Sequence, residues 1–231
     1  MIAVAGALGC HRPPQGTATP AAGSALGGFQ ALYQAHVEGV GASRSLRLAV
    51  AVGDDDRFRL EVLGPVGGAR LAIAFDGSHL RAVFPGERLC GEWQDTAAAL
   101  REMTGIALPA PQWLALLLGR LTAGDLVRYA FQIETVTNGR VMRAQLAADG
   151  PGGVGAPPTV SYTEFRPAPG GELAAEVRIQ RGAEGITLTL RQLHPIPPPV
   201  EALALPCPPG FGAAAAEAFS AAGVSFLGEE R

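Results

Sequence analysis

The chain has 231 residues, of which 48% are hydrophobic and 17% are charged, and its formal net charge is −3. This balance argues against a nucleic-acid-binding protein, which needs a basic surface to neutralise phosphates. No apolar run approaches the roughly 18 residues that span a membrane, and the length fits one β-rich domain.

The N-terminus predicts an anchored tether. Residues 1–9 are apolar and small, and they lead into Ala7-Leu8-Gly9-Cys10. This tetrapeptide resembles the lipobox of bacterial lipoproteins, in which a peptidase cuts before a cysteine that then carries lipid. Nine residues are short for a signal peptide, so we expect residues 1–9 to be the remnant of a truncated one. Residues 10–28, rich in Pro, Gly, Ala and Thr, predict a lipidated tether; the alternative is a chance cysteine in a frayed terminus.

Alternation of apolar and polar residues predicts strands along the first half of the chain, because successive strand side chains point to opposite faces. Short turns such as Asp76-Gly77 and Pro85-Gly86 separate them, which predicts an antiparallel meander. The predicted strands cover residues 29–38, 46–52, 57–63, 71–75, 80–84 and 89–93.

A helical block at about residues 95–119 interrupts this pattern. Asp95 is a good N-cap for a helix over 96–103, and Gly105 is a good stop. Pro109 and Pro111 suit the first turn of a second helix, which is apolar nearly all round and ends at Gly119. Such a helix is buried or covers a cavity.

Alternation then resumes and continues nearly to the C-terminal segment. Predicted strands cover residues 127–134, 140–147, 159–166, 173–179 and 186–190, and Asn138-Gly139 is a strong hairpin turn. Residues 194–231 form a Pro/Ala-rich C-terminal segment, because the proline-rich run from Pro195 to Pro199 ends strand structure. A weak helix is predicted over 212–222.

Together these elements predict a mainly β (α+β) fold. We expect residues 29–193 to form an incomplete antiparallel β-barrel, a strongly curved sheet of about 11 strands, with a helical lid over an apolar cavity. The alternative is that the inward side chains pack on each other and leave no cavity. The predicted lining residues are Leu48, Val50, Phe58, Leu60, Leu71, Ile73, Phe84, Trp113, Leu117, Phe131, Ile179 and Leu188.

Two blocks carry a family resemblance. The first is Leu60-Glu61-Val62-Leu63-Gly64-Pro65-Val66-Gly67; the second runs from Leu100 to Pro109 and on through Trp113-Leu114 to Leu118-Gly119. In this order and spacing they resemble LolB, the outer-membrane lipoprotein receptor family, and its LolA–LolB superfamily. The resemblance implies the half-barrel fold, a cavity for the acyl chains of lipoproteins, and a membrane-contact loop at Pro65, Val66 and Gly67. Val66 stands where the family commonly has Leu.

The resulting functional hypothesis is a non-enzymatic carrier. We expect a monomer, anchored through Cys10 in the outer membrane and facing the periplasm, that binds acylated lipoproteins or lipids and hands them to the membrane. A periplasmic carrier protein is an expected partner, and nucleic acid is not. The alternative is a non-catalytic envelope scaffold or stress-sensing interaction module of the same fold with a filled core.

The chemistry-bearing residues predict no catalytic, metal or cofactor site. The four histidines are scattered without metal-ligand spacing. Asp54-Asp55-Asp56 lacks a liganding glutamate at EF-hand spacing and is interpreted as a solvated turn. Cys90 and Cys207 can form a disulfide in an oxidising periplasm, or both can remain thiols.

Overall fold

The computed structural model describes residues 27–39, 42–64, 67–138, 140–146, 157–215 and 218. The strands are β1 (Phe29–Gly39), β2 (Ala42–Val52), β3 (Phe58–Leu63), β4 (Ala69–Phe75), β5 (Leu80–Phe84), β6 (Leu89–Trp93), β7 (Phe131–Thr137), β8 (Arg140–Leu146), β9 (Thr159–Ala168), β10 (Gly171–Arg181), β11 (Glu184–His194) and β12 (Gly212–Ala213). The helices are α1 (Thr96–Thr104), α2 (Ala110–Leu117), α3 (Ala123–Arg128) and α4 (Val200–Leu203).

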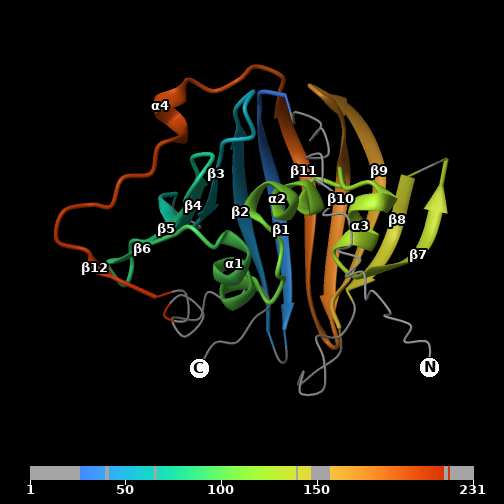
Figure 1. The fold of residues 1–231 in the computed structure, drawn as a ribbon, viewed down its shortest axis with the longest axis horizontal. Helices are drawn as coiled ribbons and strands as arrows, with labels where there is room; N and C mark the ends of the chain where they lie inside the picture. Colours follow the sequence, from blue (N-terminus) through green and yellow to red (C-terminus); the bar gives the residue numbers. More distant parts are fainter. Residues whose placement is uncertain are drawn as a thin grey trace, which may run out of the picture.

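All of these strands belong to one curved, open sheet of 12 strands (Figure 1). Their order is β12-β6-β5-β4-β3-β2-β1-β11-β10-β9-β8-β7. Neighbours pair antiparallel except β12, which lies parallel to β6. The predicted fold class, an incomplete antiparallel barrel with helices, is therefore confirmed, with a two-residue strand beyond the expected number.

The strand order forces one long crossing. Strands β1 to β6 form a meander that ends near one edge of the sheet, whereas β7 lies at the opposite edge. The chain between them contains α1, α2 and α3, which lie across one face of the sheet in Figure 1. The lid is thus the connection between the two halves of the sheet.

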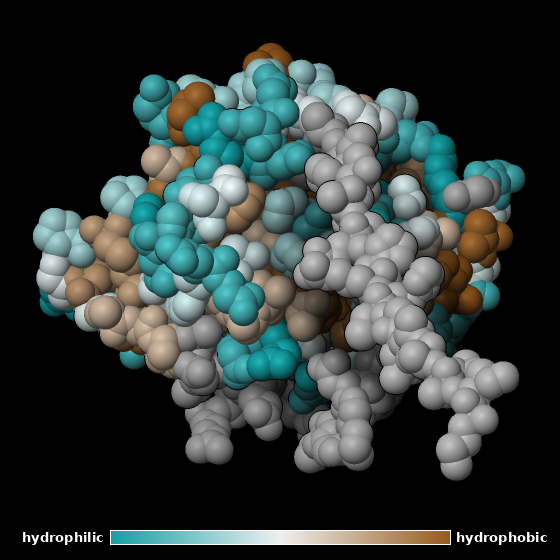
Figure 2. All heavy atoms as spheres, in the orientation of Figure 1, coloured by the Kyte–Doolittle hydropathy of each residue, from teal (hydrophilic) through white to brown (hydrophobic). Residues whose placement is uncertain are grey.

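The core lies between this lid and the sheet. Inward residues of the central strand β1, including Phe29, Tyr33 and Val37, alternate with exposed or half-exposed residues. They join lid residues such as Leu100 and Trp113 in one continuous apolar cluster. The face bearing the lid mixes hydrophilic and hydrophobic residues at the surface, with hydrophobic residues visible at the edge near β7 (Figure 2).

The helix boundaries at α1 and α2 follow the predicted signals. The Asp95 side chain accepts a hydrogen bond from the Ala98 amide at 3.0 Å, and Gly105 ends α1 in the left-handed conformation with φ 74°. A side chain disfavours this conformation, so glycine suits the position. Helix α2 then begins at Ala110, directly after Pro109.

The strand predicted over 127–134 is wrong in its first half. Residues up to Arg128 belong to α3, and Ala130 at φ 61° separates the helix from β7. Thr122 and Asp125 form a reciprocal capping box that starts this helix. The alternation from Val127 to Ile133 resembles a strand, but Val127 is 65% exposed and lies outside the core.

The helix predicted over 212–222 is also wrong at its start, because Gly212 and Ala213 form β12. Their backbone pairs with Leu89 and Cys90 of β6. Of the remaining residues in that range, only Ala214, Ala215 and Ala218 lie within the described parts of the chain.

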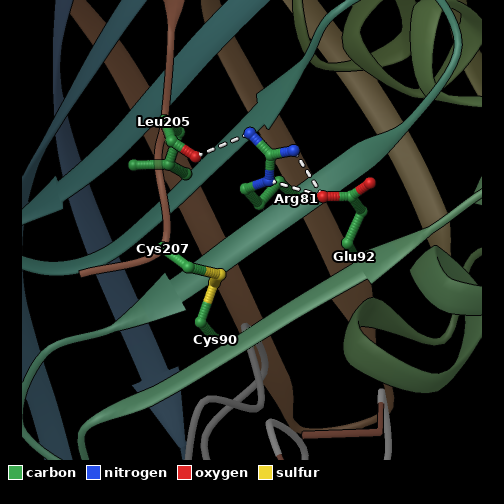
Figure 3. The surroundings of a disulfide bond; sticks show 5 residues. All are labelled: Arg81, Cys90, Glu92, Leu205 and Cys207. Carbon is green, nitrogen blue, oxygen red and sulfur yellow. Dashed lines mark hydrogen bonds and ion pairs between the residues drawn. A yellow bond between two sulfur atoms is a disulfide. The ribbon is translucent and has the colours of Figure 1, made fainter. Parts of the chain in front are cut away.

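The C-terminal segment runs as a strap, residues 195–213, outside the β3–β6 part of the sheet (Figure 1). Two arginines hold its backbone: Arg59 Nη1 donates to the Ala204 carbonyl at 2.6 Å, and Arg81 Nη1 donates to the Leu205 carbonyl at 3.0 Å. Cys207 of the strap is disulfide-bonded to Cys90 of β6, with 5.8 Å between the Cα atoms (Figure 3). The structure thereby fills in a pairing that the sequence left open.

The Cys207→Ala substitution is expected to lower the free energy of unfolding by about 2–4 kcal/mol. The disulfide closes a long segment, since its cysteines lie 117 residues apart in sequence. Urea unfolding of the non-reduced protein measures the change. Cys10→Ala is the matched control, because it removes a thiol and keeps the bond. Equal unfolding midpoints for the two variants would show that the disulfide does not stabilise the fold.

Candidate functional site

The residues predicted to line a cavity are brought together on the concave face of the sheet and the underside of the lid. All except Phe84 are at most 6% exposed, and Phe84 is half-buried. They belong to, or pack against, the apolar cluster that also contains Leu100, Met103 and Leu114 of the lid. In this conformation the lid therefore lies directly on the floor of the site.

Hydrogen bonds fasten the C-terminal end of α2 to strands β9 and β10. The Tyr162 hydroxyl of β9 donates to the Leu116 carbonyl at 2.8 Å. The Ala174 amide of β10 donates to the Leu118 carbonyl at 3.0 Å. The Leu116 carbonyl also accepts from the Gly119 amide at 3.2 Å, so Tyr162 adds a second donor to it, and Ala174 supplies a donor to the carbonyl just beyond the helix.

Arg120, just after α2, strengthens the same attachment. Its Nε donates to the Glu172 carbonyl at 3.1 Å and its Nη2 to the Pro169 carbonyl at 2.5 Å. The guanidinium also lies over the Phe29 ring, 5.5 Å from its centroid. A half-buried cation such as Arg120 is stabilised by hydrogen bonds from its donors and by a nearby aromatic face.

The α1 end of the lid is attached differently. The Ala110 amide at the start of α2 donates to Thr96 Oγ1 of α1 at 3.0 Å, which joins the two helices. Arg181 of β10 donates to the Gly105 carbonyl at 3.4 Å. The buried side of α1 is apolar and includes Ala99, Leu100 and Met103, so its contact with the core is mainly hydrophobic.

Tyr33 is a polar exception on the floor. It is 1% exposed, and its hydroxyl has no hydrogen-bond partner among the described residues. An unmade hydrogen bond at a buried group costs about 1–3 kcal/mol. Burial raises the pKa of the Tyr33 phenol, and the positive charge of Arg120 opposes that rise in pKa. The hydroxyl is thus protonated and is a donor.

A cleft of about 240 Å³ lies beside the end of the lid. Its lining includes the α2–α3 connection from Gly119 to Thr122, together with Val141 and Phe165 of the sheet. Arg140 and Glu172 form an ion pair within it, and the Arg140 guanidinium lies 5.1 Å from the centroid of the Phe165 ring. The cleft therefore offers apolar walls together with both signs of charge.

The sequence reasoning missed Tyr33, Tyr162, Arg120 and Arg140. Tyr33 occupies an inward position between Ala31 and Ala35, so a polar tip on an apolar face was visible in the alternation. The partners of the other residues depend on how β8 to β10 meet the lid, which alternation does not encode.

The predicted membrane-contact loop is described at its ends. The Gly64 amide donates to the Gly68 carbonyl at 3.0 Å, which closes a tight β3–β4 connection. Gly67 is exposed at φ 84°, and a Cβ atom built there would meet nothing within 4 Å. Pro65 and Val66 lie outside the described residues, as does Cys10.

Within the described part of the chain, no cluster of three or more His, Cys, Asp or Glu residues has metal-binding geometry. None of the helices described there is long and apolar enough to cross a membrane.

The sequence matches no family model and no curated protein significantly. Among solved structures, the chain is similar to a LolA superfamily protein from Nitrosomonas europaea: identity is 12%, the TM-score is 0.49, and coverage is 78% of this chain and 90% of that one. A putative outer membrane lipoprotein-sorting protein domain from Vibrio parahaemolyticus has 10% identity and a TM-score of 0.45, with 73% and 85% coverage. An uncharacterized conserved protein from Thermus thermophilus has 8% identity and a TM-score of 0.43, with 83% and 91% coverage. These values are too low to transfer a function, so the proposals below rest on this chain's own residues.

The Tyr162→Phe substitution is expected to destabilise the protein by about 1 kcal/mol, because it removes one hydrogen bond to the lid. Chemical unfolding measures this loss, and amide exchange in α2 should become faster. Tyr33→Phe is the matched control, since the hydroxyl that it removes has no partner among the described residues. An equal loss of stability in both variants would contradict the role assigned to the Tyr162–Leu116 bond.

Proposed function

We propose that this protein is a non-enzymatic carrier or receptor that holds the acyl chains of lipoproteins or lipids between the concave face of the sheet and the lid. One observation carries the proposal: the largest apolar surface of the fold is covered by a connection of three short helices instead of a second sheet. An acyl chain needs such a surface and requires no catalytic group to hold it.

The free energy gained by burying an acyl chain is similar in size to the free energy that holds the lid on the sheet. Burying a methylene contributes about 0.8 kcal/mol, so a chain of about a dozen methylenes gains roughly 10 kcal/mol before ordering costs. Lifting α2 alone would expose Trp113, Leu114, Leu116 and Leu117, each buried in the closed form. At about 1.5–3 kcal/mol each, these side chains contribute roughly 6–12 kcal/mol. An acyl chain lying between them and the sheet would restore much of this burial.

The second candidate is a scaffold or sensing module of the same fold with a permanently filled core. The packing of the predicted lining residues into one cluster with the lid favours it. The two functions differ in one measurable property, which is whether an acyl chain can reach the underside of the lid.

Trp113 gives a direct readout of that property, because it is buried on the lid and is one of two tryptophans in the chain. In a Trp93→Phe variant, a fatty acid brominated along its chain should quench Trp113 fluorescence saturably, since bromine quenches at contact range. The unbrominated acid is the control for indirect effects. Unchanged emission, together with a ligand-free mass in native mass spectrometry after lipid addition, would reject the carrier and favour the filled core.

The proposal extends to anchoring and delivery. Cys10 is the proposed lipid attachment site, which would hold the protein at the outer membrane facing the periplasm. Val66 is the proposed membrane-contact residue. Exposure of Gly67 beside it and the Gly64–Gly68 hydrogen bond that closes the β3–β4 connection support this role. A monomer that receives cargo from a periplasmic carrier protein fits this arrangement.

Val66→Glu is expected to reduce transfer of an acylated peptide to vesicles at least tenfold and to leave peptide binding unchanged, because a charge at an apolar contact is costly to desolvate. Val136→Glu is the matched control, since Val136 is 51% exposed on β7. Transfer and binding are measured separately with a fluorescent acylated peptide. Normal transfer by the Val66→Glu variant would show that this loop does not contact the membrane during transfer.

A further inference from the structure

We infer that the Tyr33 hydroxyl is the hydrogen-bond donor that recognises the carbonyl oxygen of an ester- or amide-linked acyl chain in the site beneath the lid. This inference rests on the proposed function and adds the chemical class of the ligand. It predicts selectivity for acyl esters and amides over ligands with the same chain and no carbonyl.

The position of Tyr33 places it on the floor of the site. It lies near the middle of β1, and its cross-strand neighbours are Leu48 of β2 and Leu190 of β11. The flanking inward residues of β1 are Ala31 and Ala35, which are much smaller. The phenol ring therefore has small neighbours along its own strand and a leucine on each side of it across the sheet.

The chemistry of the hydroxyl in its surroundings favours an oxygen acceptor. Tyr33 is 1% exposed, and its hydroxyl has no partner among the described residues. Buried polar groups almost always have partners, so an orphaned donor marks a place for one. Burial raises the phenol pKa, which keeps the proton on the oxygen, and Arg120 acts electrostatically on the same group. A positive charge nearby favours the partial negative charge of a carbonyl oxygen.

The cleft beside the lid is where we expect the polar head group of such a ligand to bind. Arg120 lines this cleft and also acts electrostatically on Tyr33, so one guanidinium influences both the cleft and the orphaned hydroxyl. With its carbonyl at Tyr33 and its acyl chain beneath α2, a ligand would place its linked head group in this cleft. There, Arg140 and Glu172 offer charges of both signs.

Tyr162 supplies the internal comparison. It is also a buried tyrosine on the inward face of the sheet, at 3% exposed, but its hydroxyl donates to the Leu116 carbonyl at 2.8 Å. The Tyr162 hydroxyl thus binds the lid, whereas the Tyr33 hydroxyl still has a hydrogen to donate to a ligand.

The test compares two ligands that differ at one carbonyl, 1-lauroylglycerol and its ether analogue 1-O-dodecylglycerol, with the full-length protein. Their dissociation constants are measured by calorimetry. The wild type is expected to bind the ester about three- to tenfold more tightly than the ether, the effect of one net hydrogen bond. Tyr33→Phe should weaken ester binding by that factor and leave ether binding unchanged, whereas Tyr162→Phe should keep the ester preference.

The outcomes separate the inference from the proposed function. If both ligands bind and Tyr33→Phe keeps the wild-type preference, the inference is overturned and the carrier stands; a buried water satisfying the hydroxyl would give this result. If neither ligand binds the wild type, the carrier proposal is rejected, and the inference about Tyr33 is rejected with it. A second measurement checks the orphaned donor itself: without ligand, Tyr33→Phe should unfold at the same or a higher urea concentration. A clearly lower midpoint would also overturn the inference, since it would mean that the hydroxyl is already bonded.

Discussion

The fold depends on one topological constraint, which is that β6 and β7 lie toward opposite edges of the same sheet. The chain must cross the whole concave face to connect them, and a buried crossing has to satisfy its own backbone amides and carbonyls. Short helices do this locally, and their apolar side chains cover the inward face of the strands. The need to connect the two halves and the need to bury the sheet are met by the same residues. Both ends of the crossing continue into strands of the sheet, so the lid is held at each end by the chain itself.

The apolar and polar parts of the site have different roles in this arrangement. Hydrophobic contacts spread over the whole floor and lack direction, so the proposed site would accept acyl chains of different lengths. The hydrogen bonds from Tyr162, Ala174 and Arg120 are directional and gather at one end of the lid. The lid is therefore best fixed beside the cleft, and its α1 end depends more on apolar packing.

Much of this architecture follows from local sequence. The strands of the first meander, the Asp95 cap, the Gly105 stop and the hairpin at Asn138 depend on neighbouring residues and were predictable. The wrong predictions have physical reasons. Alternation from Val127 predicted a strand, but the Thr122–Asp125 capping box starts a helix there, and Val127 lies outside the core. The strand β12 exists because of a partner more than a hundred residues away. The inward residues of the floor were predicted from alternation, as the lining of a cavity. The orphaned hydroxyl, the cleft and the hydrogen bonds at the end of α2 require knowing which strands face that helix.

An open barrel has two exposed strand edges, and each is a template for pairing with another chain. At one edge, β12 and the strap cover β6, and the Cys90–Cys207 bond holds them there covalently. At the other edge, register shifts near Thr135 bend β7, and charged residues such as Glu134 interrupt it. The disulfide consequently protects against edge-to-edge aggregation. In a reducing compartment the strap would be free to detach, and the exposed edge of β6 would then be open to pairing with a second molecule.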